Sequence, residues 1–326
     1  MPMSWRTTAP AVMLWAIALT GCGTGGESGV RIVTEVLVEE LDNPTAVIVA
    51  SDGSLLVAES AAGRIVSVGT DGTVTPLVSD FDVGSYAPYD IGPLSMLASP
   101  AGGLIVGEGG NPPGQERVSF WGLDGTPSGT PLVAVGGGDY YGLAIQPSTG
   151  NLLIASASTD RIFAAAPIDG GGFGEPVVVI DDTTEEPIAA TAPTALAFDA
   201  DGLLYVGFAG AESARIVRID TETSFVERIV QTDSPVTGIA FRPSDSQAFF
   251  TVFGEASRES GAVFNIGTNG VGAEFAGRLA GPTALAFDSE DALYVTTLGT
   301  PASTVAGQLL QITVEEIIEE EETGDR

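Results

Sequence analysis

The sequence contains no histidine and no lysine, and its only cysteine is Cys22. The lack of histidine excludes a Ser-His-Asp triad, a histidine general base and a histidine-ligated metal. Thiol catalysis is not expected either, because the one cysteine lies in the N-terminal segment. With histidine and thiol chemistry excluded, carboxylate chemistry is what remains for catalysis. Helical periodicity is absent after the N-terminal segment.

The charge is almost entirely of one sign. The chain has 43 acidic residues and 12 basic ones, all arginine, which gives a formal net charge of −31. A surface this negative repels phosphate backbones, so nucleic acid is not an expected partner. We interpret the charge as an aid to solubility in a salty medium, and we expect a monomer.

The first residues are predicted to be a targeting segment. Arg6 precedes the apolar run "AVMLWAIALT", and the run ends in Leu19–Cys22, "LTGC", which resembles a bacterial lipobox. The resemblance implies that residues 1–21 are a signal peptide and that Cys22 carries lipid, with 22–29 as a flexible tether. We therefore expect a lipid-anchored protein of the cell envelope. Gly23, the residue after the cysteine, resembles the residue found at that position in lipoproteins sent to an outer membrane. There the protein would face the periplasm or the cell surface. The alternative is a free or buried cysteine.

A repeated motif organises the rest of the chain. The hexapeptide "PTALAF" occurs at Pro193–Phe198 and again at Pro282–Phe287, and "LYV" begins eleven residues after each proline. Weaker copies give six anchor residues, which are Ala46, Ser95, Gly142, Ala195, Gly238 and Ala284. Their spacings are 49, 47, 53, 43 and 46 residues. A period of this size is typical of a propeller or a solenoid.

Each repeat is predicted to form four strands. The first repeat divides into "TAVIVA", "SLLVAE", "RIVSVG" and "TVTPLV", with turn pairs such as "SDG" between the runs. Six such units of antiparallel strands predict an all-β fold, a six-bladed β-propeller over residues 30–315.

The ends of the chain predict how the ring closes. The sixth repeat is one strand short, and "RIVTEVLVEE" from Arg31 has no repeat of its own. We expect Arg31–Val38 to pair with the third strand of the last blade, around Gln308–Thr313, which removes an open edge. Residues 316–326 are predicted to be an acidic tail, disordered after its first few residues.

The repeat resembles known families. A Pro or Gly, a short apolar strand, "DG", "LYV" and an Arg-Ile pair are similar to NHL-type repeats and to SMP-30/gluconolactonase-like propellers. "LDNPTAVIVASDGSLLVAES" also resembles the opening of ScyD/ScyE-type exported propellers. The resemblance covers roughly residues 31–315 and implies the fold. Such propellers include binding modules, scaffolds and hydrolases, so it does not select one function.

The resemblance weakens at the expected metal site. Lactonases of the SMP-30 type hold a divalent metal near the axis, with a Glu opening a first strand, an Asn before Gly and an Asp as ligands. Here no opening carries Glu, and the residues before Gly are Tyr141 and Thr237. Hydroxyls and small apolar groups suit a hard cation poorly. Quinone-dependent propeller dehydrogenases and propeller lyases rely on His as families. We therefore predict no cofactor and no metal ligands.

Four arginines recur at one position of the repeat. Each opens a third strand before Ile or Val, and they are Arg64, Arg117, Arg161 and Arg215. Recurrence predicts a structural role, such as bracing a loop or a carboxylate like Glu59.

The long loops predict where a ligand would bind. We expect the segments 79–92, 107–116, 181–192, 253–262 and 298–307 on the face that carries the blade connections. Loops of this kind concentrate binding residues. The candidate contacts on this face are Tyr86, Tyr89, Tyr140, Tyr141, Glu59, Glu108 and Glu255. The tyrosines suit recognition, but they could equally pack the loops down.

Further acids are expected on the same face, namely Asp82, Asp90, Asp139 and Glu259. Two of these acids could act as general acid and base if burial raised one pKa. They could instead hold Ca²⁺, although no spacing matches a calcium loop, or simply be solvated.

The hypothesis from sequence is a cell-envelope lipoprotein whose propeller is a binding or scaffolding module. The alternative is an SMP-30/gluconolactonase-like hydrolase of lactones or esters with an atypical metal site.

Overall fold

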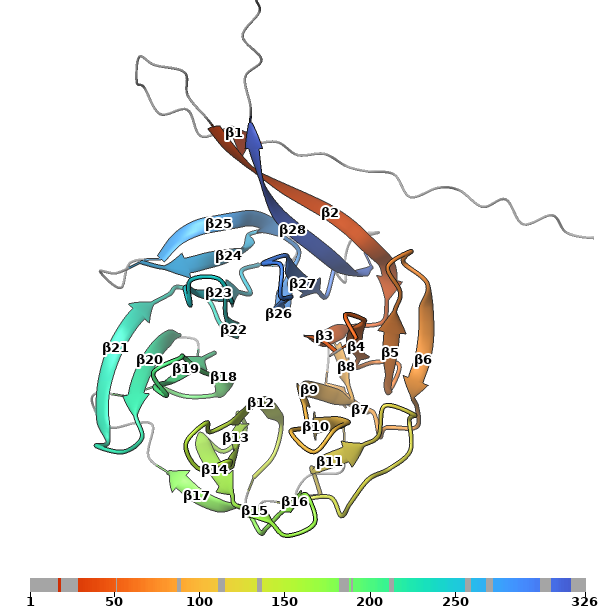
Figure 1. Ribbon diagram of the computed structural model, residues 1–326, viewed down its shortest axis with the longest axis vertical. Helices are drawn as coiled ribbons and strands as arrows, with labels where there is room; N and C mark the ends of the chain where they lie inside the picture. The colour runs from red at the N-terminus through yellow and green to blue at the C-terminus, as the bar shows by residue number, and fades with distance from the viewer. Residues whose placement is uncertain are drawn as a thin grey trace, which may run out of the picture.

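The described strands form a ring of sheets around one axis (Figure 1). The computed structural model describes residues 17–18, 29–50, 52–86, 89–110, 115–133, 137–181, 188, 190–210, 214–255, 259–267, 272–299 and 306–317. Within these ranges the elements are all β-strands, and no helix long and apolar enough to cross a membrane is found. The predicted six-bladed β-propeller is confirmed.

Blades one, three, four and five are antiparallel four-stranded sheets. Blade one consists of β3 (Pro44–Val49), β4 (Leu55–Glu59), β5 (Arg64–Val68) and β6 (Val74–Val78). Blade three consists of β12 (Tyr140–Ile145), β13 (Leu152–Ser156), β14 (Arg161–Ala165) and β17 (Val177–Ile180). Blade four consists of β18 (Pro193–Phe198), β19 (Leu204–Phe208), β20 (Arg215–Asp220) and β21 (Phe225–Gln231). Blade five consists of β22 (Val236–Phe241), β23 (Ala248–Val252), β24 (Gly261–Ile266) and β25 (Gly272–Leu279).

Blade two departs from the expected four strands. It has three, β9 (Pro93–Ala98), β10 (Leu104–Glu108) and β11 (Val118–Trp121). In place of a fourth strand, the segment 127–132 makes two isolated bridges, Trp121 with Pro127 and Val118 with Leu132. This segment contains Pro127 and Pro131, and because proline lacks a backbone N–H it cannot sustain a regular ladder.

Two short hairpins are inserted between the main strands. The first, β7 (Gly84–Tyr86) with β8 (Tyr89–Ile91), lies in the connection from blade one to blade two. The second, β15 (Pro167–Ile168) with β16 (Gly172–Phe173), lies between the third and fourth strands of blade three.

Blade six contains strands from both ends of the described chain (Figure 1). It consists of β26 (Pro282–Phe287), β27 (Leu293–Thr297), β28 (Gly307–Ile317), β2 (Gly29–Leu41) and the two-residue β1 (Ile17–Ala18). The pairing of β2 with β28 runs from Gly29 opposite Ile317 to Leu41 opposite Gly307, and it includes Arg31 opposite Glu315 and Val38 opposite Leu309. The predicted closure is confirmed, and the paired ribbon continues beyond the Thr313 expected. Of the predicted tail, Glu316 and Ile317 belong to β28, and 318–326 lie outside the described residues.

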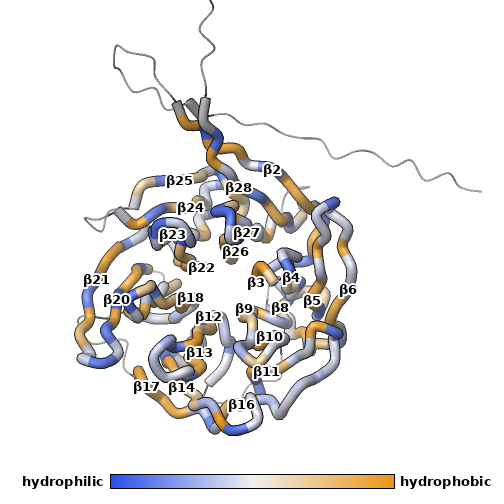
Figure 2. The backbone as a smooth tube through the Cα atoms, viewed as in Figure 1, coloured by the Kyte–Doolittle hydropathy of each residue, from blue (hydrophilic) through white to orange (hydrophobic). Residues whose placement is uncertain are grey.

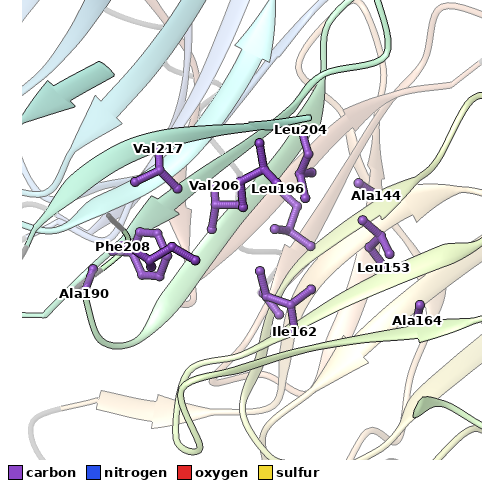
Figure 3. Close-up of a cluster of buried hydrophobic side chains, with 13 residues drawn as sticks. Ala144, Leu153, Ile162, Ala164, Ala190, Leu196, Leu204, Val206, Phe208 and Val217 are labelled. Carbon is purple, nitrogen blue, oxygen red and sulfur yellow. The ribbon is translucent and has the colours of Figure 1, made fainter. Parts of the chain in front are cut away.

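The hydrophobic core is divided among the six interfaces between neighbouring blades. One cluster joins blades three and four, where Leu153 and Ile162 face Leu196, Leu204 and Val206 (Figure 3). Equivalent clusters occupy the other five interfaces. Strands carry most of the apolar residues along the chain (Figure 2). Each blade therefore depends on both neighbours for burial, which is why the ring needs a closing strand.

Candidate functional site

The innermost strand of every blade opens with the same irregularity. One residue is left without a partner in the ladder between the first and second strands, so that a β-bulge stands at the start of each first strand. The bulge residues are Thr45, Leu94, Tyr141, Thr194, Thr237 and Thr283. A bulge turns its side chain away from the regular alternation.

The bulges direct hydroxyl groups across the blade boundaries. Thr45 Oγ1 donates to the carbonyl of Pro93 (2.8 Å), and Thr237 Oγ1 donates to the carbonyl of Pro282 (2.7 Å). The same bond joins Thr194 to the Val236 carbonyl (2.5 Å) and Thr283 to the Pro44 carbonyl (2.7 Å). In blade two the next residue takes this role, because Ser95 Oγ donates to the Tyr140 carbonyl (2.6 Å). Five of these interfaces are thus linked by a hydroxyl on an inner strand.

The interface between blades three and four is built differently. Tyr141 occupies the bulge, and Gly142 follows it. A Cβ on Gly142 would lie 3.1 Å from the Thr194 carbonyl oxygen and from Leu196 Cγ, so glycine permits a close backbone approach here. Tyr141 is 36% exposed, and it is the one aromatic residue at the six bulge positions.

The four candidate tyrosines are in different environments. Tyr140 is 0% exposed and belongs to the core cluster between blades two and three. For Tyr140 the packing alternative therefore holds, and its ring is not available as a surface contact. Tyr89 is half-buried at the start of β8, and burial raises its pKa. Tyr86 ends β7, but its side chain lies outside the described residues.

Two of the three candidate glutamates are buried ion-pair partners. Glu59 is 1% exposed; its Oε2 lies 2.5 Å from Arg64 Nε, and its Oε1 accepts a hydrogen bond from the Asp42 N–H (2.9 Å). Glu108 is also 1% exposed, and its Oε2 lies 3.0 Å from Arg117 Nε, in an ion pair that lacks hydrogen-bond geometry. Both carboxylates are thus buried and paired, and neither is available as a surface contact for a ligand. Glu255 is exposed, and its N–H donates to Ser260 Oγ (2.7 Å).

The arginines that open third strands have the bracing role that their recurrence predicted. Arg64 and Arg117 hold the two buried glutamates. Arg161 pairs with Asp181 (2.5 Å), and the buried Arg215 donates to the Ile188 carbonyl (3.2 Å). Both of the latter contacts fasten the connection between blades three and four.

Of the other acids, Asp90 accepts a hydrogen bond from Ser85 Oγ (2.7 Å) across the β7–β8 hairpin. Asp82 is mostly exposed, 3.7 Å from Arg117 Nη2, and Glu259 is exposed with a φ of 50°. No group of three acidic side chains able to hold a metal lies within the described residues. The Ca²⁺ prediction therefore gains no support there.

Asp139, one of the acids expected on this face, lies between blades two and three beside a second carboxyl, Glu116, which sequence reasoning did not identify. Glu116 is 6% exposed, and Asp139 has a φ of 49° with its Oδ1 buried and without a hydrogen-bond partner in the described structure. Burial, followed by the charge of Glu116, raises the pKa of Asp139. Two glycines make room for the pair, since a Cβ on Gly109 would be 3.1 Å from Asp139 Oδ1 and one on Gly138 would be 3.4 Å from Glu116 Cδ.

The sequence did contain a signal for Glu116. An acid precedes the third-strand arginine in blades two and three, as Glu116-Arg117 and Asp160-Arg161. Asp160 Oδ1 accepts a hydrogen bond from the Ala192 N–H (2.6 Å). The position thus carries carboxyl groups that face the blade connections.

The Asp139→Asn variant should be more stable than the parent at pH 7, and its advantage should shrink as the pH falls toward the ordinary aspartate pKa of about 4. A raised pKa means that the folded state binds the proton more tightly, so the parent loses stability as the pH rises from the ordinary aspartate value through the raised one. Melting temperatures across this pH range measure the effect.

Asp80→Asn is the matched control for this prediction. Asp80 also has a positive φ, 69°, but it is exposed. Asparagine tolerates this backbone conformation well, so Asp80→Asn reports the pH-independent part of the substitution. A constant difference between Asp139→Asn and the parent at every pH would contradict the buried-pair interpretation.

Comparisons with known proteins identify the fold. No family model matches the sequence, and no curated protein matches it. Among solved structures, the PQQ-bound aldose sugar dehydrogenase from Streptomyces coelicolor is similar with a TM-score of 0.65 and 17% identity, covering 89% of this chain and 99% of that one. The gluconolactonase XC5397 from Xanthomonas campestris gives 0.61 and 14%, covering 88% and 90%.

A streptogramin B lyase is also similar, with a TM-score of 0.58 and 15% identity, covering 87% of this chain and 98% of that one. At these identities the similarity concerns the fold alone. The chain is thus a six-bladed β-propeller of the kind found in gluconolactonases, consistent with the SMP-30-like fold that its repeats resemble.

Proposed function

We propose that this chain is a lipid-anchored, monomeric protein of the cell envelope whose propeller binds a ligand at the mouth formed by the inner-strand openings. The observation that carries the proposal is the use of the opening residues. Five hydroxyls donate to carbonyls of the next blade, and Tyr141 instead presents an exposed aromatic side chain. A tyrosine side chain combines an apolar aromatic surface with a hydroxyl, and on a rigid scaffold it suits ligand recognition.

The divalent metal that the lactonase resemblance implies does not fit these residues. A hard cation needs several oxygen ligands with carboxylates among them. The bulge positions offer threonine hydroxyls that are committed to ring closure, together with Leu94 and Tyr141. The nearby carboxylates Glu59 and Glu108 are committed to arginines. We therefore derive no metal-dependent step.

The ligand site can be tested by photo-crosslinking in living cells. A benzophenone side chain placed at Tyr141 should give a covalent adduct with the bound molecule, whereas one at Asp52, in the turn between β3 and β4, should not. With the partner identified, Tyr141→Ala should weaken binding by about 2 kcal/mol, or about thirtyfold. Adducts at position 52 and none at 141 would show that the opposite face binds.

The anchor is tested separately. Cys22→Ala should release the protein from membranes into the soluble fraction, because the acyl chains that hold it at the bilayer are attached at that residue. Mass spectrometry of the parent should find the chain beginning at a lipid-modified Cys22. This processing would remove β1, which pairs only with Arg31 and Ile32. Membrane-bound material with an unmodified Cys22 would refute the anchor.

A hydrolase of lactones or esters is the second candidate, and the Glu116–Asp139 pair is the observation that favours it. The raised pKa of Asp139 beside a second carboxyl suits general acid–base catalysis. The same candidate predicts turnover of simple lactones that Asp139→Asn abolishes. Turnover that survives this change would show that Asp139 is not the catalytic acid or base, and no turnover in the parent would favour the binding function.

A further inference from the structure

A second cleft lies on the opposite side of the propeller from the inner-strand openings, between blades four and five. It has a volume of about 640 Å³, and its rim includes the turns Asp199–Asp201 and Asp245–Gln247, which join first to second strands. The volume falls within the roughly 300–1,000 Å³ of small-molecule sites. Its wall contains an edge-to-face aromatic pair, Tyr205 with Phe241, with ring centroids 5.1 Å apart.

A row of three polar side chains crosses blade four at this cleft. Tyr205 on β19 lies opposite Arg218 on β20, which lies opposite Glu227 on β21, so the three share one face of the sheet. Arg218 Nη2 lies 2.5 Å from Glu227 Oε2. A hydrogen bond with Tyr205, and then that with Glu227, raises the pKa of Arg218. All three side chains line the cleft.

In blade six the side chains of the equivalent row form hydrogen bonds with one another. There the second "LYV" motif places Tyr294 opposite Gln311, and Gln311 opposite Glu35. The Tyr294 hydroxyl donates to Asp288 Oδ2 (3.0 Å) and accepts from Gln311 Nε2 (3.3 Å).

Blade four differs at two points of this row. Asp199 is the counterpart of Asp288, and its Oδ1 accepts from the Asp201 and Leu203 N–H groups. Within the described residues no hydrogen bond joins Tyr205 to Asp199. Arginine replaces the glutamine, and its guanidinium has more N–H groups than Tyr205 and Glu227 use. The blade-four row therefore offers the spare N–H groups of a guanidinium at the position where blade six has an amide that bonds Tyr294.

We propose that this cleft binds a neutral saccharide. Arg218 pairs with Glu227, and Asp245 pairs with Arg242 beside the cleft, while Asp199 and Asp201 add two further carboxylates to its lining. An anionic ligand would therefore be repelled. The neighbouring hydroxyl groups of a saccharide both donate and accept hydrogen bonds. They match the Arg218 donors and the Asp199 carboxylate, while Phe241, half-buried against the buried Tyr205 ring, offers an apolar surface to a sugar ring. The cleft is independent of the mouth assigned above.

The test uses the folded full-length propeller and an array of oligosaccharides with neutral and acidic members. The parent should retain neutral saccharides, and calorimetry with the best of them should show binding about tenfold or more weaker for Arg218→Gln, which recreates the blade-six row. Tyr205→Phe should also weaken binding, whereas the matched change Tyr294→Phe should leave it unchanged. Melting temperatures of all variants confirm that they are folded.

Three results would overturn the proposal. The first is that the parent retains no neutral saccharide on the array. The second is that it retains acidic saccharides alone. The third is that Arg218→Gln and the parent bind the best neutral saccharide with equal affinity. None of these results bears on crosslinking at Tyr141, so the two proposals fail separately.

Discussion

Deletion of residues 30–39 should remove most of the stability of the propeller. The segment forms most of β2, whose pairing with β28 closes the ring. Its apolar side chains Ile32, Val36, Leu37 and Val38 pack into the clusters on either side of blade six. At about 1.5 kcal/mol each, their burial contributes about 6 kcal/mol. That is a large part of the roughly 5–15 kcal/mol that stabilises a typical domain.

The control for this deletion is truncation from Glu319 onward, which leaves every pair of β28 intact and should change the melting temperature little. A point variant makes the same test without shortening the chain. Val38 is 7% exposed and Val30, on the same strand, is 54% exposed, so Val38→Asp should destabilise strongly and Val30→Asp should not. Closure by β2 is wrong if the deletion variant melts at the parent's temperature.

Replacement of Arg64 by methionine should lower the free energy of unfolding by about 3 kcal/mol. The change leaves Glu59 as a 1% exposed carboxylate with one backbone N–H as its remaining partner. Adding Glu59→Gln should restore much of the loss, because a neutral amide can still accept that hydrogen bond and carries no charge into the interior. Denaturant unfolding of the two single variants and the double variant measures the coupling.

Arg161→Met is the matched control for Arg64→Met. Arg161 opens the same strand in blade three, but its partner Asp181 is 64% exposed, and an exposed pair contributes about 1 kcal/mol or less. The buried carboxylate is therefore what should make Arg64 costly to remove. Equal losses for Arg64→Met and Arg161→Met would mean that burial of Glu59 is not the cause.

The repeat made the architecture predictable because its signals are local. Alternating apolar residues and turn pairs recur in every unit, and the two "PTALAF" copies anchored the register. The orphan strand from Arg31 and the short sixth repeat together predicted the pairing with β28, which the structure confirms. Blade two is the exception. The sequence contains prolines at 127 and 131, but their effect on the fourth strand was not predicted.

The candidate site was less predictable because it depends on which way neighbouring side chains point. Tyr140 and Tyr141 are adjacent and chemically identical, yet one is fully buried and the other is exposed. Adjacent strand residues point to opposite faces, and the bulge at Tyr141 shifts the alternation, so sequence reasoning could not tell which of the two is buried. Glu59 and Glu108 were expected as ligand contacts on the face of the blade connections, but they are buried against arginines of the neighbouring strand.

The sequence by itself determined the number of blades, the closing strand and the classes of catalysis that a chain without histidine excludes. Each of these follows from composition, from the number of repeats, or from the segments that the repeats leave over at the two ends. Only the tertiary structure decided that Thr45, Thr237 and Thr283 link neighbouring blades, since their acceptors are about one repeat away or at the other end of the chain. The same holds for the Glu116–Asp139 pair and the cleft between blades four and five, because both form where two neighbouring blades meet.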